Sequence, residues 1–473
     1  MVTLYSSSAS SLSQPEVLIQ EQVHALISDG ASARCFALVF THQAYYLPQP
    51  TELSLVALVA LSLTESRVDI QGAILEDSPL VRQQILNLPA DRQAFAAFAS
   101  DYQIPWLCFT EPLRLAPVHI AKPWGQEIWY SGIEARGQSA VTAQGFCTPL
   151  PWIMSLMPKA LAAGREKDLI LLKILDPLAE EVYGDLYFEL HDQKQEVYIV
   201  TRIDERAWPT GEGAIRLGFN TDLRAQYPDD EAFKRAYLET VSDYRDIRCT
   251  IDQLLDQQRL ACGIDLSAPV DAQTLITWQR ELPPTLVQEE LIKRRQMDQF
   301  TALHPLRQGD VIKVPCRVPH ALQHGVRTVE FQTPVYERKI LSFAQKVLTQ
   351  AEWDTQVALR NIILEANAQP AVDVLHASEQ VRIERVVTFD DFEVRRLHLQ
   401  ARQSTLLEAT KDYALLMLLS GDVMVHNNGS TQSALGSAAI NVAFFLPASG
   451  GEYRVEAGNS AAIVLLAMPR MAR

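Results

Sequence analysis

Residues 184–196 read GDLYFELHDQKQE, and this stretch decides how the chain folds. Side chains two positions apart on a strand point to the same face, so Glu189 and His191 project together. Glu196 lies just past a short Asp–Gln turn, and the next strand can return it to the same interior. The stretch therefore predicts adjoining strands that carry one histidine and two carboxylates into one cavity.

A second stretch, residues 309–320, reads GDVIKVPCRVPH. Its strand is expected to end in a turn that can place His320 in the same interior. The four side chains together offer two imidazoles and two carboxylates. A divalent first-row metal prefers such a mixture of borderline nitrogen and hard oxygen donors, with positions left for water or substrate. Each residue alone is weak evidence for a ligand, but the paired arrangement indicates a metal site.

A helical block separates these two stretches. Between residues 221 and 303 apolar residues recur every three or four positions, which is typical of an amphipathic helix. Asp229 or Asp230 is expected to cap the first helix of this block, and Gly263 to end it. The apolar stripe of that helix consists of Phe233, Tyr237, Val241, Tyr244, Ile247, Ile251 and Leu254.

The whole chain is expected to be mainly β with α insertions. Residues 35–40 are expected to form a strand and residues 78–88 an amphipathic helix, while Asn428–Gly429 predicts a hairpin near the C-terminus. The expected domains are an N-terminal α/β region of unknown role at 1–115, a metal-binding β domain at 116–220 and 304–340, an inserted helical domain at 221–303, a helical bridge at 341–379 and a second β barrel at 380–473.

The composition narrows the possible partners and compartment. Of the 473 residues 48% are hydrophobic, and the net charge is −15 without a cluster of Lys and Arg, which argues against a nucleic-acid partner or an anionic membrane surface. The most apolar run, residues 53–63, has about half of the roughly 20 residues that a membrane span needs. The six cysteines show no paired spacing, so we expect reduced thiols and a cytoplasmic protein.

The two stretches resemble the two motifs of the cupin superfamily. The first is similar to the motif G…HxH…E, with Glu189 in the place of the first histidine. The second is similar to G…PxG…H, with Arg317 where the middle glycine stands. The resemblance implies two cupin barrels, each a double-stranded β-helix or jelly roll, with the helical domain inserted in the first.

More narrowly, the chain resembles the type I phosphomannose isomerases (mannose-6-phosphate isomerases). Residues 171–177, LLKILDP, are similar to that family's K-x-L-D strand, and the family also inserts a helical domain between its two motifs. Residues 189–191 fall on its Gln-x-His and residues 194–196 on its Lys-x-Glu. Residues 318–325 and 330–332 are similar to its HA…G…E-x-Q run.

This resemblance implies a metal-dependent aldose–ketose isomerase of carbohydrate metabolism. Its substrate would be a small-molecule sugar or sugar phosphate, as in the interconversion of mannose 6-phosphate and fructose 6-phosphate. The implied ligands of a zinc ion, or of another divalent first-row metal, are Glu189, His191, Glu196 and His320. The implied catalytic residues are Lys194, Glu330 and Arg338.

The sequence departs from the family pattern at three places near the site. Glu189 replaces Gln, Tyr187 stands where the family has a phosphate-contacting Ser, and Asp192 replaces Pro in a shorter loop. Two other functions therefore stay open. One is a cupin metalloenzyme that acts on a different sugar or in an oxygen-dependent step, and the other is a catalytically degenerate homologue that binds a sugar and serves regulation.

Overall fold

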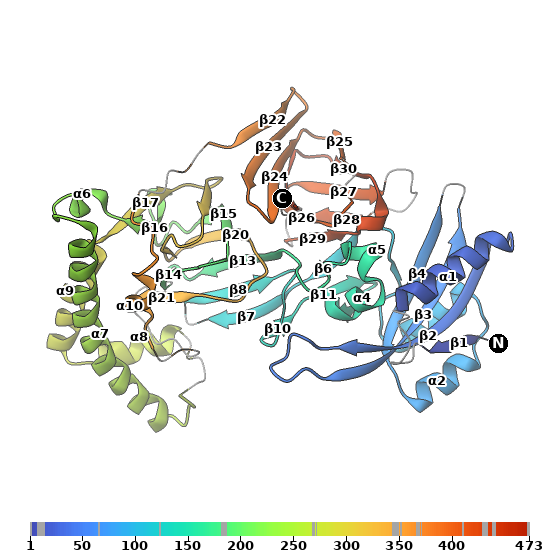
Figure 1. Ribbon diagram of the computed structural model, residues 1–473, viewed down its shortest axis with the longest axis horizontal. Helices are drawn as coiled ribbons and strands as arrows, with labels where there is room; N and C mark the ends of the chain where they lie inside the picture. The colour runs from blue at the N-terminus through green and yellow to red at the C-terminus, as the bar shows by residue number, and fades with distance from the viewer. Residues whose placement is uncertain are drawn as a thin grey trace. The chain divides into compact units, whose positions relative to one another are not determined.

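The computed structural model divides the chain into two compact units (Figure 1). Unit 1 comprises Met1–Val118, Trp129–Leu172 and Val372–Arg473, and unit 2 comprises His119–Ile128 and Lys173–Ala371. The structure describes residues 2–6, 15–64, 67–122, 124–180, 187–266, 270, 272–342, 350, 352–365, 369, 371–408, 411–427, 434–437 and 441–470. Each unit is described separately below.

The N-terminal part of unit 1 is a mixed sheet with helices packed on it. β3 is apolar and buried along most of its length, as expected for a strand that is covered on both faces. Helices α2 (Pro79–Leu86) and α3 (Arg92–Asp101) share a core with Val56 and Leu58 of β3, and α1 (Pro15–Ser28) packs against β2 and β3. The predicted strand at 35–40 and helix at 78–88 are confirmed. The sheet order is β1 (Thr3–Ser6), β2 (Ala33–Gln43), β3 (Glu52–Leu63), β4 (Val68–Glu76) and β5 (Leu107–Cys108).

Two further sheets of unit 1 face one another. Leu416 of β26 and Val464 of β31 lie in one sheet, and they share a core with Val425 and Val455 of the other. The larger sheet runs in the order β12 (Phe146–Pro149), β11 (Ala140–Ala143), β6 (Leu113–Ala116), β29 (Ala443–Leu446), β26 (Ala414–Ser420), β31 (Ala462–Pro469), β24 (Phe392–Leu399), β23 (Val381–Thr388) and β22 (Asp373–Ala377). The smaller runs in the order β25 (Ser404–Leu407), β30 (Tyr453–Ala457), β27 (Asp422–Asn427) and β28 (Ala434–Ser437).

This arrangement differs from the expected domain boundaries. Residues 113–149 supply β6, β11 and β12 to the sheet that holds the C-terminal strands, whereas the sequence had placed residues from 116 onward in the metal-binding domain. The small ladder of β9 (Ile133–Glu134) and β10 (Gly137–Gln138) lies between β6 and β11 in the chain. Two helices, α4 (Leu150–Leu156) and α5 (Pro158–Ala162), follow β12. The Asn428–Gly429 hairpin lies outside the described residues.

Unit 2 contains another pair of facing sheets. Leu175, Tyr198 and Ile312 of one sheet share a core with Ile215 and Leu322 of the other. One sheet runs in the order β18 (Val311–Val314), β15 (Glu196–Ile203), β20 (Val326–Gln332), β13 (Leu171–Pro177), β8 (Gly125–Trp129) and β7 (Val118–Lys122). The other runs in the order β17 (Thr301–Leu306), β16 (Gly213–Phe219), β19 (His320–Leu322), β14 (Phe188–Leu190) and β21 (Lys339–Ser342).

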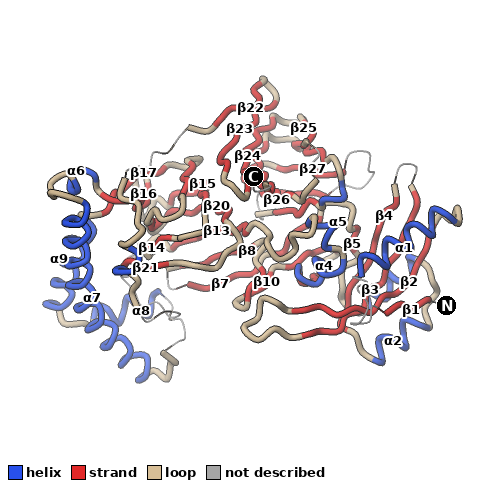
Figure 2. Tube along the Cα trace, viewed as in Figure 1, coloured by secondary structure: helices blue, strands red, loops and turns tan. Residues whose placement is uncertain are grey.

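Four described helices of unit 2 lie between β16 and β17 in the chain, and Figure 2 shows them in blue. Asp229 caps α7, because its side chain accepts a hydrogen bond from the backbone nitrogen of Ala232. The apolar stripe of α7 packs against Phe188 and Leu190 of β14, and this contact covers the outer face of the second sheet. The helices are α6 (Thr221–Arg224), α7 (Asp230–Ala261), α8 (Ala272–Arg280) and α9 (Pro284–Asp298).

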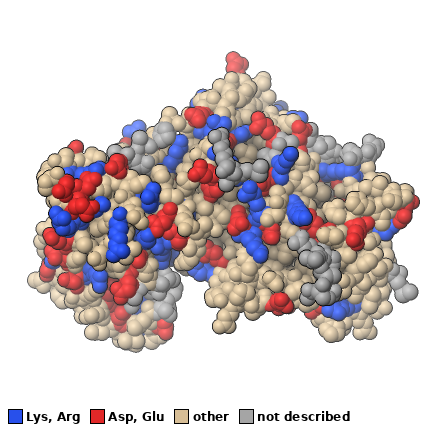
Figure 3. Space-filling model, in the orientation of Figure 1, with Lys and Arg blue, Asp and Glu red and all other residues tan. Residues whose placement is uncertain are grey.

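The described residues of the predicted helical bridge at 341–379 contain little helix. Leu341 and Ser342, at the start of the bridge, belong to the strand β21, which pairs with β14. Among the described residues of 341–379, helix is confined to the short α10 (Thr355–Ala358), and 373–377 form the strand β22. No described helix is long and apolar enough to cross a membrane. On the face shown in Figure 3, basic and acidic side chains are interspersed.

Candidate metal centre

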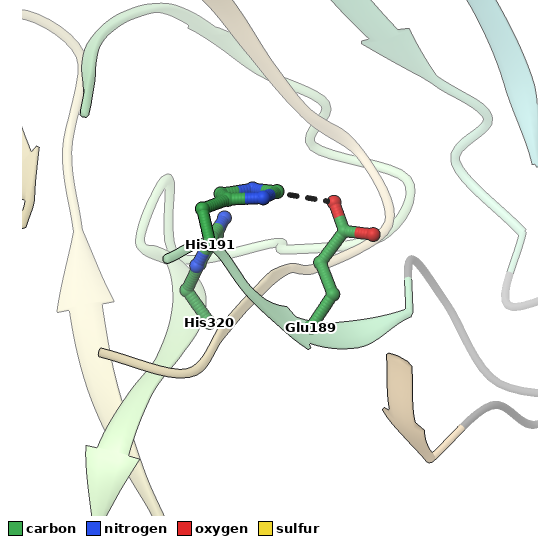
Figure 4. Close-up of side chains that lie close together, drawn as sticks. All are labelled: Glu189, His191 and His320. Carbon is green, nitrogen blue, oxygen red and sulfur yellow. Dashed lines mark ion pairs between the residues drawn. The ribbon is translucent and has the colours of Figure 1, made fainter. Parts of the chain in front are cut away.

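Strand pairing brings the two sequence motifs together. Glu189 of β14 lies directly opposite His320 of β19 in an antiparallel ladder. Phe188 and Leu190 face α7, so the alternation of the strand turns Glu189 to the opposite face, toward the interior between the sheets. His191 follows β14 directly, and Figure 4 shows its ring beside that of His320 with the Glu189 carboxylate turned toward it.

The three side chains form a compact group of potential ligands. Glu189, His191 and His320 each offer one atom, and these atoms lie within 4.8 Å of one another. The His191 Nε2 atom is 3.9 Å from Glu189 Oε1, and the two imidazole centroids are 5.2 Å apart. Both histidines are buried.

Glu196 enters the same group from the other sheet, as the first residue of β15. Its Oε1 atom lies 3.3 Å from His191 Nε2 and 2.8 Å from Lys194 Nζ. Its Oε2 atom lies 3.1 Å from His320 Nε2 and accepts a 2.6 Å hydrogen bond from the Tyr198 hydroxyl. Burial acts against the charged carboxylate, but Lys194 and His191 outweigh it and hold the pKa of Glu196 well below its usual range.

The hydrogen bonds of the histidines fix which nitrogen faces the cluster. His191 Nδ1 lies 2.9 Å from the carbonyl oxygen of Glu337, and His320 Nδ1 lies 3.2 Å from that of Val318. A carbonyl oxygen accepts only, so each Nδ1 donates, and each Nε2 is the nitrogen that faces the cluster. Burial lowers the pKa of His191, which keeps this ring neutral at pH 7.

The cluster therefore brings two imidazole nitrogens and two carboxylates to one point. His320 Nε2 lies within hydrogen-bond distance of Glu196 Oε2, whereas neither His191 Nε2 nor Glu189 Oε2 has a hydrogen-bond partner among the described residues. Buried acceptors without donors are unfavourable unless a cation lies among them. An Nδ1–H bonded to a backbone carbonyl is also the usual orientation of a metal-binding histidine. The residues present fit a divalent cation.

A cleft of about 470 Å³, partly open to solvent, adjoins the cluster. Of the predicted catalytic residues, Glu330 and Arg338 line this cleft. Lys194 is not among its lining residues and instead bonds to Glu196. The cleft is lined by Trp124, Glu127, Lys173, Leu175, Tyr187, Glu189, Glu196, Tyr198, His320, Ala321, Leu322, Glu330 and Arg338.

Three residues that sequence reasoning did not assign contribute to the site. Lys173 of β13 forms a buried ion pair with Glu330, with Nζ 3.2 Å from Oε1. Burial acts to lower the pKa of Lys173, but the charges of Glu330, Glu127 and Glu196 raise it, so the ammonium is retained. Tyr198 lies two positions after Glu196, and this spacing on one strand face could have revealed it. Glu337 lies on a loop, where no local pattern predicts its contact with His191.

The fold and the cluster define a class: a β-rich, cupin-like protein with a group of histidines and carboxylates suited to a divalent metal. No protein-family model matches the chain, and no curated protein matches it. Solved structures of mannose-6-phosphate isomerases are similar. That from Bacillus subtilis covers 76% of this chain and 99% of its own, with a TM-score of 0.51 and 12% identity.

Two further structures give the same result. The apo form of mannose 6-phosphate isomerase from Salmonella typhimurium covers 76% of this chain and 99% of its own, with a TM-score of 0.52 and 12% identity. A zinc-bound mannose 6-phosphate isomerase covers 76% and 100%, with a TM-score of 0.52 and 12% identity. At this identity the similarity concerns the fold, which is the one that the sequence motifs imply.

Proposed function

We propose that the protein is a metal-dependent aldose–ketose isomerase that acts on a sugar or sugar phosphate. The observation that carries the proposal is the buried group of imidazole Nε2 atoms and carboxylate oxygens beside a cleft that is partly open to solvent. The similarity of fold to mannose-6-phosphate isomerases supports the same reaction class. We also propose a cytoplasmic location and a second, metal-free cupin barrel formed by the facing sheets of unit 1.

Glu189, His191, Glu196 and His320 would hold the metal, zinc or another divalent first-row ion. Such an ion polarises the oxygens of an open-chain sugar next to the carbon that exchanges its proton. Tyr198 and Lys194 hold Glu196 in place through its two oxygens, and Glu337 fixes the orientation of His191.

The remaining groups have the roles that isomerisation requires. Glu330 lines the cleft with its Oε2 atom unpartnered among the described residues, and it is the proposed base that moves the proton between neighbouring carbons. Lys173 holds Glu330 in position through the ion pair. Arg338, and Lys194 behind Glu196, would supply positive charge for the enediolate that forms.

Metal analysis of purified variants tests this proposal. Wild-type protein should hold about one divalent ion per chain, and His191→Ala and His320→Ala should each lose it. His24→Ala, which removes an exposed histidine of α1, is the matched control and should keep the ion. The same proteins are assayed for interconversion of aldoses and ketoses, free and as 6-phosphates. Metal binding that survives both variants would refute the ligand set.

One observation favours a second function. The closest group comprises two histidines and one carboxylate, and this set with open positions is also the one that non-haem iron oxygenases use. That function requires Fe²⁺ and consumption of oxygen with substrate, which an oxygen electrode measures. Metal and sugar binding without any turnover would instead indicate a regulatory sugar-binding protein.

A further inference from the structure

The cleft beside the metal cluster has unsatisfied hydrogen-bond acceptors on its wall. Glu189 Oε2 and Glu330 Oε2 are buried, and neither has a hydrogen-bond partner among the described residues. Both side chains line the cleft. A ligand that meets these atoms must therefore bring hydrogen-bond donors. Hydroxyl groups donate, whereas an ionised phosphoryl group offers acceptors.

Among the described residues, three ammonium groups near the cleft are each already matched by a carboxylate. Lys173 Nζ lies 3.2 Å from Glu330, Lys122 Nζ lies 3.3 Å from Glu127, and Lys194 Nζ lies 2.8 Å from Glu196. A phosphoryl group would have to compete with these carboxylates for the same cations. Protein sites for phosphate offer it backbone N–H groups of a helix N-terminus, arginines, or a lysine that can turn to the phosphate.

The remaining cation of the cleft wall is also engaged. The Arg338 guanidinium lies over the ring of Tyr187, 5.4 Å from its centroid. Among the described residues four carboxylates and two cations line the cleft, and a divalent ion would offset Glu189 and Glu196. Lys173 and Arg338 then balance Glu127 and Glu330, so the wall offers a phosphoryl dianion no excess of positive charge.

The apolar part of the wall suits a sugar ring. Trp124, Leu175 and Tyr187 lie on the same cleft as Glu189 and Glu330. Aromatic and aliphatic surfaces accept the C–H faces of a sugar, while carboxylates accept hydrogen bonds from its hydroxyl groups. These two kinds of surface are complementary to an uncharged polyhydroxy compound.

We propose that the substrate of this site is an unphosphorylated sugar, bound through its hydroxyl groups to the carboxylates of the cleft. This inference rests on the proposed isomerase function and narrows its substrate class. Binding and turnover are measured separately on the zinc-loaded protein. Calorimetry is carried out with mannose, fructose, a panel of other uncharged hexoses and pentoses, the two 6-phosphates and inorganic phosphate, and kcat/KM is determined for each sugar.

The expected result is that an uncharged sugar binds and is converted with kcat/KM on the order of tenfold or more above that of its 6-phosphate, because the wall has no excess positive charge to offset the desolvation of a phosphoryl dianion. Inorganic phosphate should neither bind nor inhibit. The variant Glu127→Gln removes the carboxylate paired with Lys122, so it should increase affinity for the 6-phosphates several-fold. The control Glu134→Gln, which breaks a pair with Arg136 away from this cleft, should not.

The outcomes separate this inference from the proposed function. Preferred turnover of a 6-phosphate would overturn the inference and leave the isomerase proposal standing. Binding of an uncharged sugar without interconversion would overturn the isomerase proposal and support the inference. Failure of every uncharged sugar to bind the zinc-loaded protein would overturn the inference directly.

Discussion

Replacement of Lys173 by Met tests whether the Lys173–Glu330 pair stabilises unit 2. Both side chains are almost fully buried, with 12% and 1% of their surfaces exposed. Removal of one member of a buried ion pair leaves a buried charge without its partner and costs about 3–5 kcal/mol. In a unit of about 200 residues, 1 kcal/mol lowers the melting midpoint by about 2–4 °C, so we expect a decrease of about 6–20 °C.

This cost should depend on pH in a defined direction. Burial, together with the charge of Glu196, raises the pKa of Glu330 well above its usual range, and loss of Lys173 raises it further. Between the raised pKa of Glu330 in the wild type and its still higher value in the variant, the folded variant binds more protons than the folded wild type. Its stability relative to wild type therefore falls as pH rises, by up to about 1.4 kcal/mol per pH unit.

The assay is differential scanning calorimetry of the metal-free protein at pH 5 and pH 8. Lys173→Met/Glu330→Gln should recover most of the stability that Lys173→Met loses, since the double variant has no buried charge at this position. Lys293→Met, which removes an exposed pairing with Glu289, should change the midpoint by little. Equal costs at both pH values, or a double variant as unstable as the single one, would contradict the reasoning.

Three smaller perturbations test other parts of the fold. Asp229→Ala removes the cap of α7 and should cost about 1 kcal/mol in chemical denaturation, whereas Asp230→Ala should cost less. Burial raises the pKa of Cys35 to about 11, so little of this thiol is ionised at pH 8. Iodoacetamide at pH 8 should therefore alkylate the exposed Cys249 well before Cys35, which peptide mass mapping measures. Equal alkylation rates of the two cysteines would refute this. Burial lowers the pKa of His42, so the unfolded chain binds a proton at a higher pH than the folded chain does. The free energy of unfolding should therefore fall as pH drops below 6.5, and this fall should be absent in His42→Phe. Melting midpoints of wild type and His42→Phe that change in parallel with pH would disprove this.

Local patterns predicted the elements that carry the site. The alternation of residues 184–196 predicted correctly that Glu189 and His191 lie together, and the stripe of 233–254 correctly predicted α7. These patterns are readable because one face of each element is buried against a single neighbour. The roles of the candidate ligands and catalytic residues stay predictions.

The patterns failed where distant pairing determines the structure. Residues 341 and 342 fall in the predicted helical bridge, yet they belong to β21, which pairs with β14. Residues 113–116 gave no local indication that their partner is β29, more than 300 residues later in the chain. No role was assigned to Lys173 because its ion-pair partner, Glu330, lies on another strand and cannot be identified from the sequence around the lysine. Such information resides in tertiary contacts and not in a sequence window.

The nesting of the two units has a consequence for biosynthesis. β6 pairs with β29, and β31 lies between β24 and β26, so the largest sheet of unit 1 needs strands from both ends of the chain. Unit 2 lies between these strands in the chain. It has emerged from the ribosome once residue 371 and enough further residues to fill the exit tunnel have been synthesised. Unit 2 can thus fold during translation, while the largest sheet of unit 1 must await β29 and β31, and until then the edge of β6 that pairs with β29 stays open. Non-local strand pairing is slow, which makes this interval the period in which the nascent chain most depends on protection from aggregation.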